Sequence, residues 1–221
     1  MKRFSLALVL ISFLTVSAQQ KAKVSDLDLT KMKQEYGVAL VGKTVTAEAP
    51  RINGMVYKDA IGTHAKSVLK ILLDKDALRF SADVGVADCG TNPEDGSLAV
   101  SPLVDGTKIL WKRNGDEKQF AGLVGKNGKI ERGSVCFVVK GDGKELFNSG
   151  VVRGGESPVH VDVDLKGVSL LEMYALPTDD GASGDHALWI SPEIEYTVKA
   201  PRTTDAGAID KGPEMTGETA D

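Results

Sequence analysis

Side chains that usually carry chemistry are scarce in this sequence. It has two cysteines, three histidines and two tryptophans among 221 residues. The cysteines, Cys89 and Cys136, form neither a CxxC pair nor the Cys/His spacing of a zinc site. Two interpretations of them stay open: they pair as a disulfide in an oxidising compartment, or they are two small buried residues that never meet.

Clustered positive charge is also missing. The chain has 27 Lys and Arg against 31 Asp and Glu, and the two signs are interspersed. A nucleic-acid-binding domain needs a basic face or stripe. We therefore expect no nucleic-acid partner.

Long helical periods are rare, whereas 24 Gly and 8 Pro divide the chain into short segments. Short apolar or alternating runs separated by turn residues are typical of an antiparallel β-sandwich or barrel. We predict an all-β domain over residues 22–199, with hairpin turns at 105–106 and 141–143. The predicted strands are 67–73, 77–86, 98–104, 108–111, 120–124, 134–139, 145–148, 159–164, 168–176 and 187–198.

The first 18 residues have the pattern of a secretory signal peptide. Lys2 and Arg3 precede an apolar run over residues 4–16, and Ser17-Ala18 offers the small residues of a cleavage site. The run is too short to span a membrane comfortably. We expect a periplasmic or secreted protein with no membrane insertion after cleavage of residues 1–18.

Residues 200–221 differ in composition from the predicted domain. They are rich in acidic residues, Pro and Gly, and Ile209 and Met215 are their only sizeable apolar side chains. A segment that buries so little apolar surface cannot offset its ordering entropy. We predict a disordered tail.

One short stretch matches a known motif by its letters. Residues 37–44, GVALVGKT, fit the phosphate-loop pattern G-x-x-x-x-G-K-[ST], whose function needs a buried strand before it and a helix after it. A polar segment precedes the match, and β-branched residues, Pro50 and Gly54 follow it, which disfavours a helix. We interpret the match as coincidental.

An acidic loop before the last predicted strand carries several candidate site residues. Carboxylates and loop carbonyls are the ligands that calcium prefers, so Asp179 and Asp180 are candidate ligands of a structural calcium ion. Alternatively, Asp185 and His186 hydrogen-bond sugar hydroxyls while an aromatic ring packs on an apolar sugar face. A third interpretation is an acidic turn that caps a strand, with Trp189 buried in the core. The apolar residues that follow favour this last interpretation for Trp189.

The other two histidines differ in their surroundings. His64 lies just before a predicted strand, whereas His160 lies on the polar face of an alternating strand. We predict that His160 is solvated, and we expect His64 and Trp189 to lie close together, at least one of them mostly buried.

Seven segments occur in an order that resembles a known family: VSDL (24–27), YG (36–37), IGTHAKS (61–67), FSADVGVAD (80–88), GSVCF (133–137), LFNSG (146–150) and GDHALW (184–189). Together they resemble the NPCBM domain, also classed as carbohydrate-binding module family 51. The resemblance implies a jelly-roll β-sandwich similar to galactose-binding and discoidin-like domains. It also implies non-catalytic binding of carbohydrate, with galactose-containing glycans among the ligands.

The resemblance places the expected carbohydrate site around His64, Asp185 and His186. We expect Trp111 to supply the aromatic face if the insertion that carries it folds over the rim, and Trp189 otherwise. The sequence departs from the family in two places. Residues 89–132 form a long insertion, which covers the usual ligand edge or extends it with Trp111. Leu188 stands where the family commonly has Asp, so one polar contact is missing.

Three classes of function follow from these observations. The first is an exported sugar-binding module. The alternative is a structural or protein-interaction β-sandwich that has lost sugar binding, with a protein partner. An enzyme is not expected, because glycoside hydrolysis needs two carboxylates set across the scissile bond and the sequence singles out no such pair.

Overall fold

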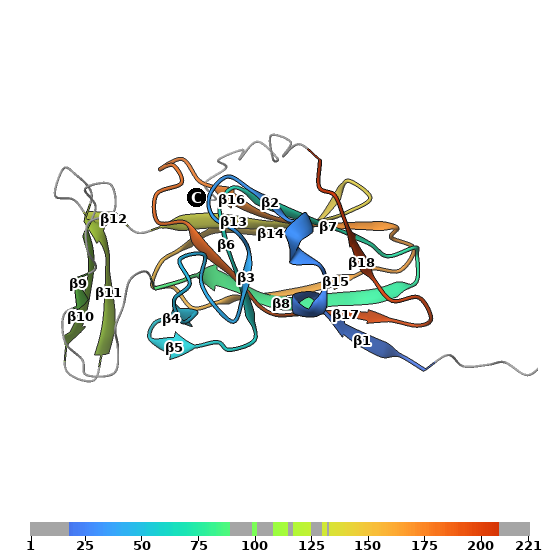
Figure 1. The fold of residues 1–221 in the computed structure, drawn as a ribbon, viewed down its shortest axis with the longest axis horizontal. Coiled ribbons are helices and arrows are strands. Elements are labelled where there is room, and N and C mark those ends of the chain that lie inside the picture. Colours follow the sequence, from blue (N-terminus) through green and yellow to red (C-terminus); the bar gives the residue numbers. More distant parts are fainter. Residues whose placement is uncertain are drawn as a thin grey trace, which may run out of the picture.

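The described structure consists mainly of two antiparallel sheets (Figure 1). The computed structural model describes residues 18–88 and 133–207, together with the backbone of four strands between these ranges. The first sheet contains β1 (Gln20–Lys23), β3 (Leu40–Val41), β6 (Ala60–His64), β8 (Ala77–Val86), β15 (Val159–Asp164) and β17 (His186–Tyr196). The second contains β2 (Lys33–Gln34), β7 (Ser67–Leu72), β13 (Ser134–Gly141), β14 (Lys144–Arg153), β16 (Leu170–Pro177) and β18 (Arg202–Thr204).

The strand order of each sheet brings distant parts of the chain together. The first sheet has the order β15-β8-β17-β6-β3, and β1 also pairs with β17. The second has the order β14-β13-β16-β7-β18, and β2 also pairs with β7. All pairings are antiparallel. The predicted all-β, antiparallel sandwich is confirmed.

Smaller elements complete the described chain. Two 3-10 turns, η1 (Val24–Asp26) and η2 (Leu29–Lys31), follow β1, and a hairpin is formed by β4 (Arg51–Ile52) and β5 (Met55–Val56). The predicted insertion contains a four-stranded sheet in the order β12-β11-β10-β9. Its strands are β9 (Ala99–Val100), β10 (Lys108–Asn114), β11 (Glu117–Val124) and β12 (Ile130–Glu131).

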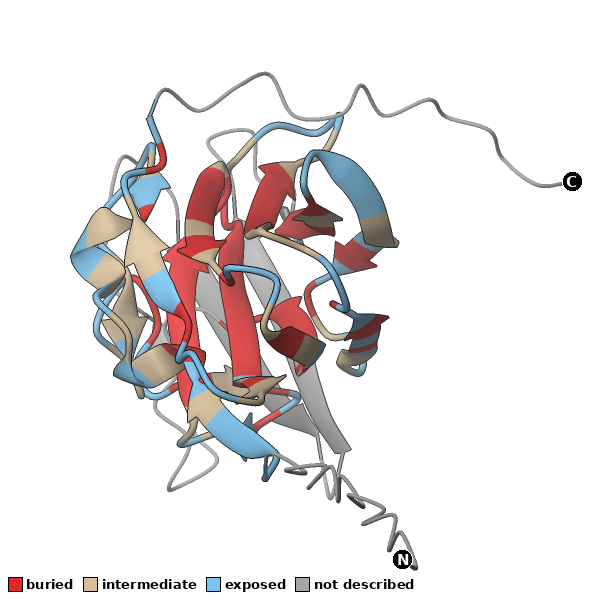
Figure 2. Cartoon of the chain, turned by 90° about the vertical axis from the view of Figure 1, so that its right-hand side faces the viewer, coloured by how far each residue is buried: buried red, intermediate tan, exposed pale blue. Residues whose placement is uncertain are grey.

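The apolar faces of the two sheets form one core. Trp189 of β17 lies 6.3 Å from Phe80 of β8 and 5.3 Å from Phe137 of β13, measured between ring centroids. All three side chains are essentially inaccessible to solvent. Buried residues are concentrated in the central strands, and exposed residues on the peripheral segments (Figure 2). Because side chains alternate along a strand, each sheet puts every second residue into this core.

The β13–β14 hairpin shows how local sequence sets local structure. Gly141 pairs with Lys144 across a two-residue turn, in which Asp142 and Gly143 have φ angles of 50° and 80°. Positive φ at both central positions is the geometry of a type I′ turn, for which Asp-Gly is favoured. The predicted hairpin at residues 141–143 is confirmed.

The phosphate-loop match does not lead into a helix. After β3, the chain turns, and the Thr44 hydroxyl lies 3.0 Å from the Thr46 hydroxyl and accepts a hydrogen bond from the Glu48 N–H. Thr44 is buried. The local structure therefore lacks the helix N-terminus that a phosphate loop needs.

The start of the predicted tail differs from the prediction. Residues 202–204 form β18 against β7, and Ala206 is 3% exposed in an apolar cluster on the outer face of the second sheet. Prediction from apolar content missed this strand because backbone pairing and two small buried residues, Pro201 and Ala206, hold it. Residues 208–221 lie outside the described residues, as does the predicted signal peptide except for Ala18. Within the described part of the chain, no helix is long and apolar enough to cross a membrane.

Candidate functional site

Two histidines that are far apart in the sequence lie side by side on the first sheet. His64 ends β6, His186 begins β17, and the two residues are directly paired in the register of these strands. Their ring centroids are 5.7 Å apart in an edge-to-face arrangement, and each residue is 8% exposed. Directly opposed residues of neighbouring strands share a face of the sheet. The two histidines of the predicted site are thus brought together.

An exposed aromatic ring borders this pair. The ring centroid of Tyr36 lies 5.0 Å from that of His64, and Tyr36 is 51% exposed. Gln34 fixes the approach of this segment, because its side chain donates to the Tyr36 carbonyl and accepts from the Thr63 hydroxyl, both at 2.6 Å. Sequence reasoning did not single out Tyr36 as a site residue, although the Tyr36-Gly37 turn was part of the family resemblance.

Asp185 lies beneath the histidines rather than beside a ligand surface. Its side chain has no solvent exposure, and Oδ1 accepts a hydrogen bond of 2.8 Å from the Ser134 N–H. The Asp185 carbonyl accepts another from the Ala65 N–H at 3.1 Å. Asp185 therefore ties the starts of β13 and β17 to the end of β6, and it belongs to the framework of the site.

Two polar atoms of this framework have no hydrogen-bond partner. They are Asp185 Oδ2 and His186 Nδ1, both buried. Burial raises the pKa of Asp185 to about 7, against the opposing effect of the Ser134 N–H, and the nearby Asp180 charge adds to the rise. Burial, with a smaller effect of His64, lowers the pKa of His186 to about 4. An unpaired buried charge is costly, so both groups favour their neutral forms.

His64 is also held in its neutral form. Burial lowers its pKa, although a hydrogen bond to the Ala65 carbonyl and the charge of Glu35 oppose this effect. Because Nδ1 lies against the Ala65 carbonyl oxygen, Nδ1 must carry the proton. The remaining nitrogen, Nε2, is then a hydrogen-bond acceptor.

The acidic loop lies next to this framework. Asp179 and Asp180 are both exposed, and Asp180 Oδ1 accepts hydrogen bonds of 2.6 Å from the hydroxyls of Ser134 and Thr178. Burial raises the pKa of Asp180, but these two hydrogen bonds, a backbone hydrogen bond and the charge of Arg153 together outweigh it, so the pKa is lowered. Among the described residues, no group of three or more His, Cys, Asp or Glu could hold a metal ion. Calcium binding by Asp179 and Asp180 stays a prediction.

Trp189 lies on the opposite face of the first sheet from His64 and His186. It pairs with Ile61, three residues before His64, and belongs to the main core, where it is 1% exposed. The structure therefore differs from the predicted shared site of His64 and Trp189. The interpretation of Trp189 as a buried core residue agrees with its position, and its ring has no face available to a sugar.

The remaining candidate residues fall in different places. Leu188 is fully buried beneath the β4–β5 hairpin, in a cluster with Ile52 and Ile190. His160 is exposed on β15, as predicted, and its Nδ1 lies 2.7 Å from Asp83 Oδ1. Trp111 belongs to β10, but its side chain lies outside the described residues, and so does Cys89. Cys136 is buried, and its thiol donates to Asn148 Oδ1.

Sequence comparison identifies the family of this domain. Residues 20–114 and 107–195 match the NPCBM/NEW2 domain. The chain belongs to this family. No curated protein matches the NPCBM chain. The two matched pieces overlap at residues 107–114, inside the predicted insertion.

Solved structures with the same fold are CBM51 domains. The CBM51 domain from Clostridium perfringens GH95, in complex with methyl-galactose, has a TM-score of 0.56 at 20% identity, over 79% of this chain and 99% of that one. The CBM51-2 domain in complex with GlcNAc and the INT domains from C. perfringens ZmpB have a TM-score of 0.57 at 16% identity. The similarity covers 82% of this chain and 33% of that one. The tandem CBM51 modules of Sp3GH98 from Streptococcus pneumoniae have a TM-score of 0.54 at 16% identity, over 80% of this chain and 47% of that one. The NPCBM chain thus spans about a third of the ZmpB structure and about half of the tandem modules.

Proposed function

We propose that this NPCBM domain is an exported, non-catalytic module that binds galactose-containing glycans at Tyr36, His64 and His186. The observation that carries the proposal is the direct pairing of the two histidines, with a half-exposed tyrosine ring 5.0 Å from one of them. The methyl-galactose complex of the GH95 domain supports the choice of sugar. The signal-peptide pattern of residues 1–18 supports export.

Two neutral imidazoles suit a sugar better than a charged ligand. The Nδ1 proton of His64 is bonded to the Ala65 carbonyl, so its Nε2 can accept a hydrogen bond from a sugar hydroxyl, and the burial of His186 Nδ1 leaves Nε2 as the ring nitrogen of His186 available to a ligand. The lowered pKa values keep both rings neutral at neutral pH. The exposed ring of Tyr36 supplies the apolar face on which a sugar ring packs, a role that Trp189 cannot fill in the core.

Asp185 acts on this site indirectly. Its hydrogen bond with Ser134 fixes the residue that precedes His186, while its side chain stays out of contact with solvent. We assign it a positioning role.

A protein-interaction function is the second candidate. Four large apolar residues are exposed along the segment that covers the first sheet: Val38, Val41, Met55 and Val56. Exposed apolar side chains are the ones that a protein partner would cover. Capture of a defined protein partner by a domain that binds no glycan is the result that favours this function.

Titration calorimetry with methyl β-galactoside tests the proposed function. His186→Ala and Tyr36→Ala each remove one contact, so each should weaken binding about ten- to hundredfold. His160→Ala is the matched control, because His160 is an exposed histidine on another strand of the same sheet. Absence of binding to any glycan on an array, or equal losses in His160→Ala and His186→Ala, would contradict the proposal.

Export is tested separately from binding. When the full-length chain is expressed in a bacterium, N-terminal sequencing of the periplasmic or secreted protein should show cleavage after Ala18 or close to it. A chain that stays in the cytoplasm with residues 1–18 intact contradicts export and leaves the glycan measurement unaffected.

A further inference from the structure

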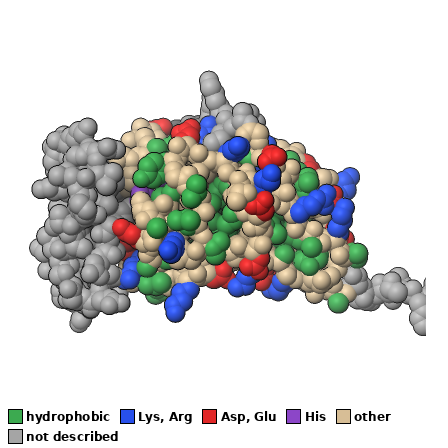
Figure 3. Space-filling view, viewed as in Figure 1, with side chains coloured by type: hydrophobic (Ala, Val, Ile, Leu, Met, Phe, Trp, Pro, Cys, Tyr) green, Lys and Arg blue, Asp and Glu red, His purple; other side chains and the backbone are tan. Residues whose placement is uncertain are grey.

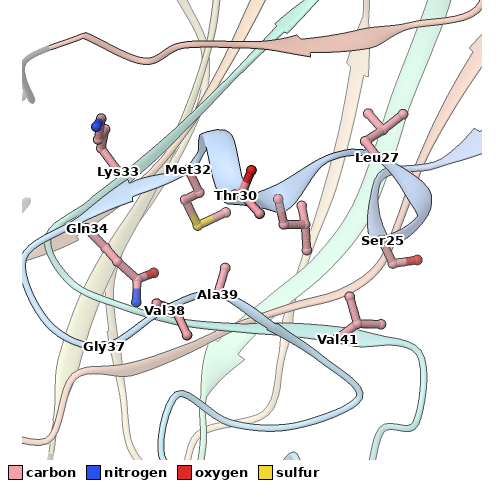
Figure 4. A pocket seen from close by; sticks show the side chains of 11 residues that line it. Ser25, Leu27, Thr30, Met32, Lys33, Gln34, Gly37, Val38, Ala39 and Val41 are labelled. Atoms are coloured by element: carbon pink, nitrogen blue, oxygen red, sulfur yellow. The ribbon is translucent and has the colours of Figure 1, made fainter.

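A groove next to the histidine site is not used by the proposed function. It has a volume of about 520 Å³ and runs between residues 25–34 and residues 37–41. Figure 4 shows Met32 pointing from the first segment towards Val38 and Ala39 in the second, with Val41 farther along. The space-filling view shows apolar side chains exposed at several places on this face of the molecule (Figure 3). The apolar lining of the groove consists of Leu27, Leu29, Met32, Val38, Ala39 and Val41.

The lining indicates an uncharged aliphatic ligand. Among the described residues, Lys33 is the only charged one that lines the groove, and its ammonium group points away from Val38 and Ala39 (Figure 4). The polar lining residues with side chains are otherwise Ser25, Thr30 and Gln34, all uncharged. No aromatic ring lines the groove, so it lacks the platform on which a second sugar would stack.

The size of the groove favours a small ligand over a protein. Ligand sites typically have volumes of about 300–1,000 Å³, a range that includes this groove. A stable protein interface needs about 800 Å² from each partner, whereas this groove is bounded by two short segments. An alkyl chain fits both the volume and the chemistry of the lining.

The groove adjoins the Tyr36 segment through two of its lining residues, Gln34 and Gly37. Gln34 lines the groove and also donates to the Tyr36 carbonyl, and its side-chain oxygen accepts from Thr63, the neighbour of His64. Gly37 lines the groove directly after Tyr36. Its φ of 66° turns the chain here, and a Cβ would lie 2.6 Å from Val45 Cγ2. The groove therefore begins one residue after Tyr36 in the chain, which places it next to the ring on which the sugar is proposed to pack.

We propose that this groove binds the alkyl chain of an amphiphilic glycoside whose sugar occupies the site of Tyr36, His64 and His186. The sugar half of this statement rests on the proposed function, whereas the alkyl half rests on the groove alone. The ligand class is a glycolipid-like molecule with a single aliphatic chain next to its sugar. Each methylene that enters the groove should tighten binding by up to about fourfold, by the usual free energy of burying a CH₂ group.

Calorimetric titration with octyl β-galactoside, below its micelle-forming concentration, and with methyl β-galactoside tests the proposal. We expect the octyl compound to bind at least tenfold more tightly than the methyl compound. Val38→Asp should abolish this difference, because it places a carboxylate at the groove on a residue that is 65% exposed and tolerant of substitution. Met55→Asp is the matched control, since Met55 is 62% exposed and does not line the groove.

Different outcomes separate the two proposals. Equal affinity for the two galactosides, or an octyl preference that survives Val38→Asp, overturns the alkyl site while the sugar site stands. His186→Ala should weaken both galactosides by the same factor and keep the octyl preference. If neither galactoside binds, the proposed function fails, and 1-octanol then tests the groove alone. Octanol binding that Val38→Asp removes and Met55→Asp keeps supports the groove, and absence of octanol binding overturns it.

Discussion

Replacing Asp185 by Asn should expose a pH dependence of stability that the native protein hides. Asp185 has a pKa of about 7 in the folded protein, against an ordinary value of 3.8. Its folded form therefore holds a proton that the unfolded chain has released, so its contribution to stability is full below pH 3.8 and is lost as the pH rises towards 7. His186 has the opposite dependence, because its pKa falls from 6.5 to about 4. Its contribution is full above pH 6.5 and is lost as the pH falls towards 4.

The two effects nearly cancel over most of this window. One pKa unit corresponds to about 1.4 kcal/mol, so the Asp185 shift is worth roughly 4 kcal/mol and the His186 shift roughly 3 kcal/mol. Between about pH 4 and pH 6.5 the two slopes are equal and opposite, so together they leave the stability nearly constant. Asn has the shape of Asp and keeps an oxygen for the Ser134 N–H, but it does not titrate. The Asp185→Asn protein should therefore gain roughly 3 kcal/mol of stability between pH 4 and pH 6.5.

Urea unfolding followed by tryptophan fluorescence measures this dependence, because the buried ring of Trp189 becomes exposed on unfolding. The native protein and the Asp185→Asn and His186→Gln variants are compared at several values from pH 4 to pH 8. His186→Gln should lose stability over the range in which Asp185→Asn gains it. Two variants whose profiles run parallel to that of the native protein would refute the assigned shifts.

Three further substitutions test the framework by urea unfolding. Trp189→Ala should cost about 3–5 kcal/mol, because it empties the centre of the core, and a loss below about 1 kcal/mol would contradict that position. Gly62→Ala places a Cβ 2.1 Å from the Lys43 carbonyl oxygen, so it should destabilise the protein and increase amide exchange at residues 43–44, and unchanged exchange there would contradict this close contact. Asp88→Ala removes the acceptor for the N–H groups of Asn53 and Gly54 and should cost about 1–3 kcal/mol. Unchanged exchange at the tip of the β4–β5 hairpin would contradict this last prediction.

Strand prediction succeeded where side-chain alternation was strong. The run at residues 159–164 coincides with β15, and the predicted strand at 77–86 coincides with β8. The N-terminal strands β2 to β5 have two residues each, so no period can be read from them. β6 was missed because all five of its residues, AIGTH, are buried and show no alternation. β18 was missed because backbone pairing holds it rather than apolar side chains.

The site was predictable in its residues but not in their roles. The sequence singled out His64, Asp185 and His186, and the register of β6 against β17 brings the two histidines together. Sequence alone cannot give that register, so it could not show that His186 lies opposite His64, although the apolar residues after Trp189 already favoured a core position for that ring. It also could not show that the Asp185 carboxylate pairs with a backbone N–H of a strand 51 residues away. Tyr36 was missed because a tyrosine beside a turn has no distinctive spacing.

The framework is fixed on both sides of the insertion. Asp88, the last residue before it, accepts hydrogen bonds from the hairpin turn at Asn53 and Gly54. Gly133, the first residue after it, packs so closely on Gly184 that a Cβ would lie 2.0 Å from the Gly184 carbonyl oxygen. These anchoring contacts are made between residues of the sandwich itself. We therefore expect both anchor points to stay in place when residues 89–132 are replaced by a shorter linker.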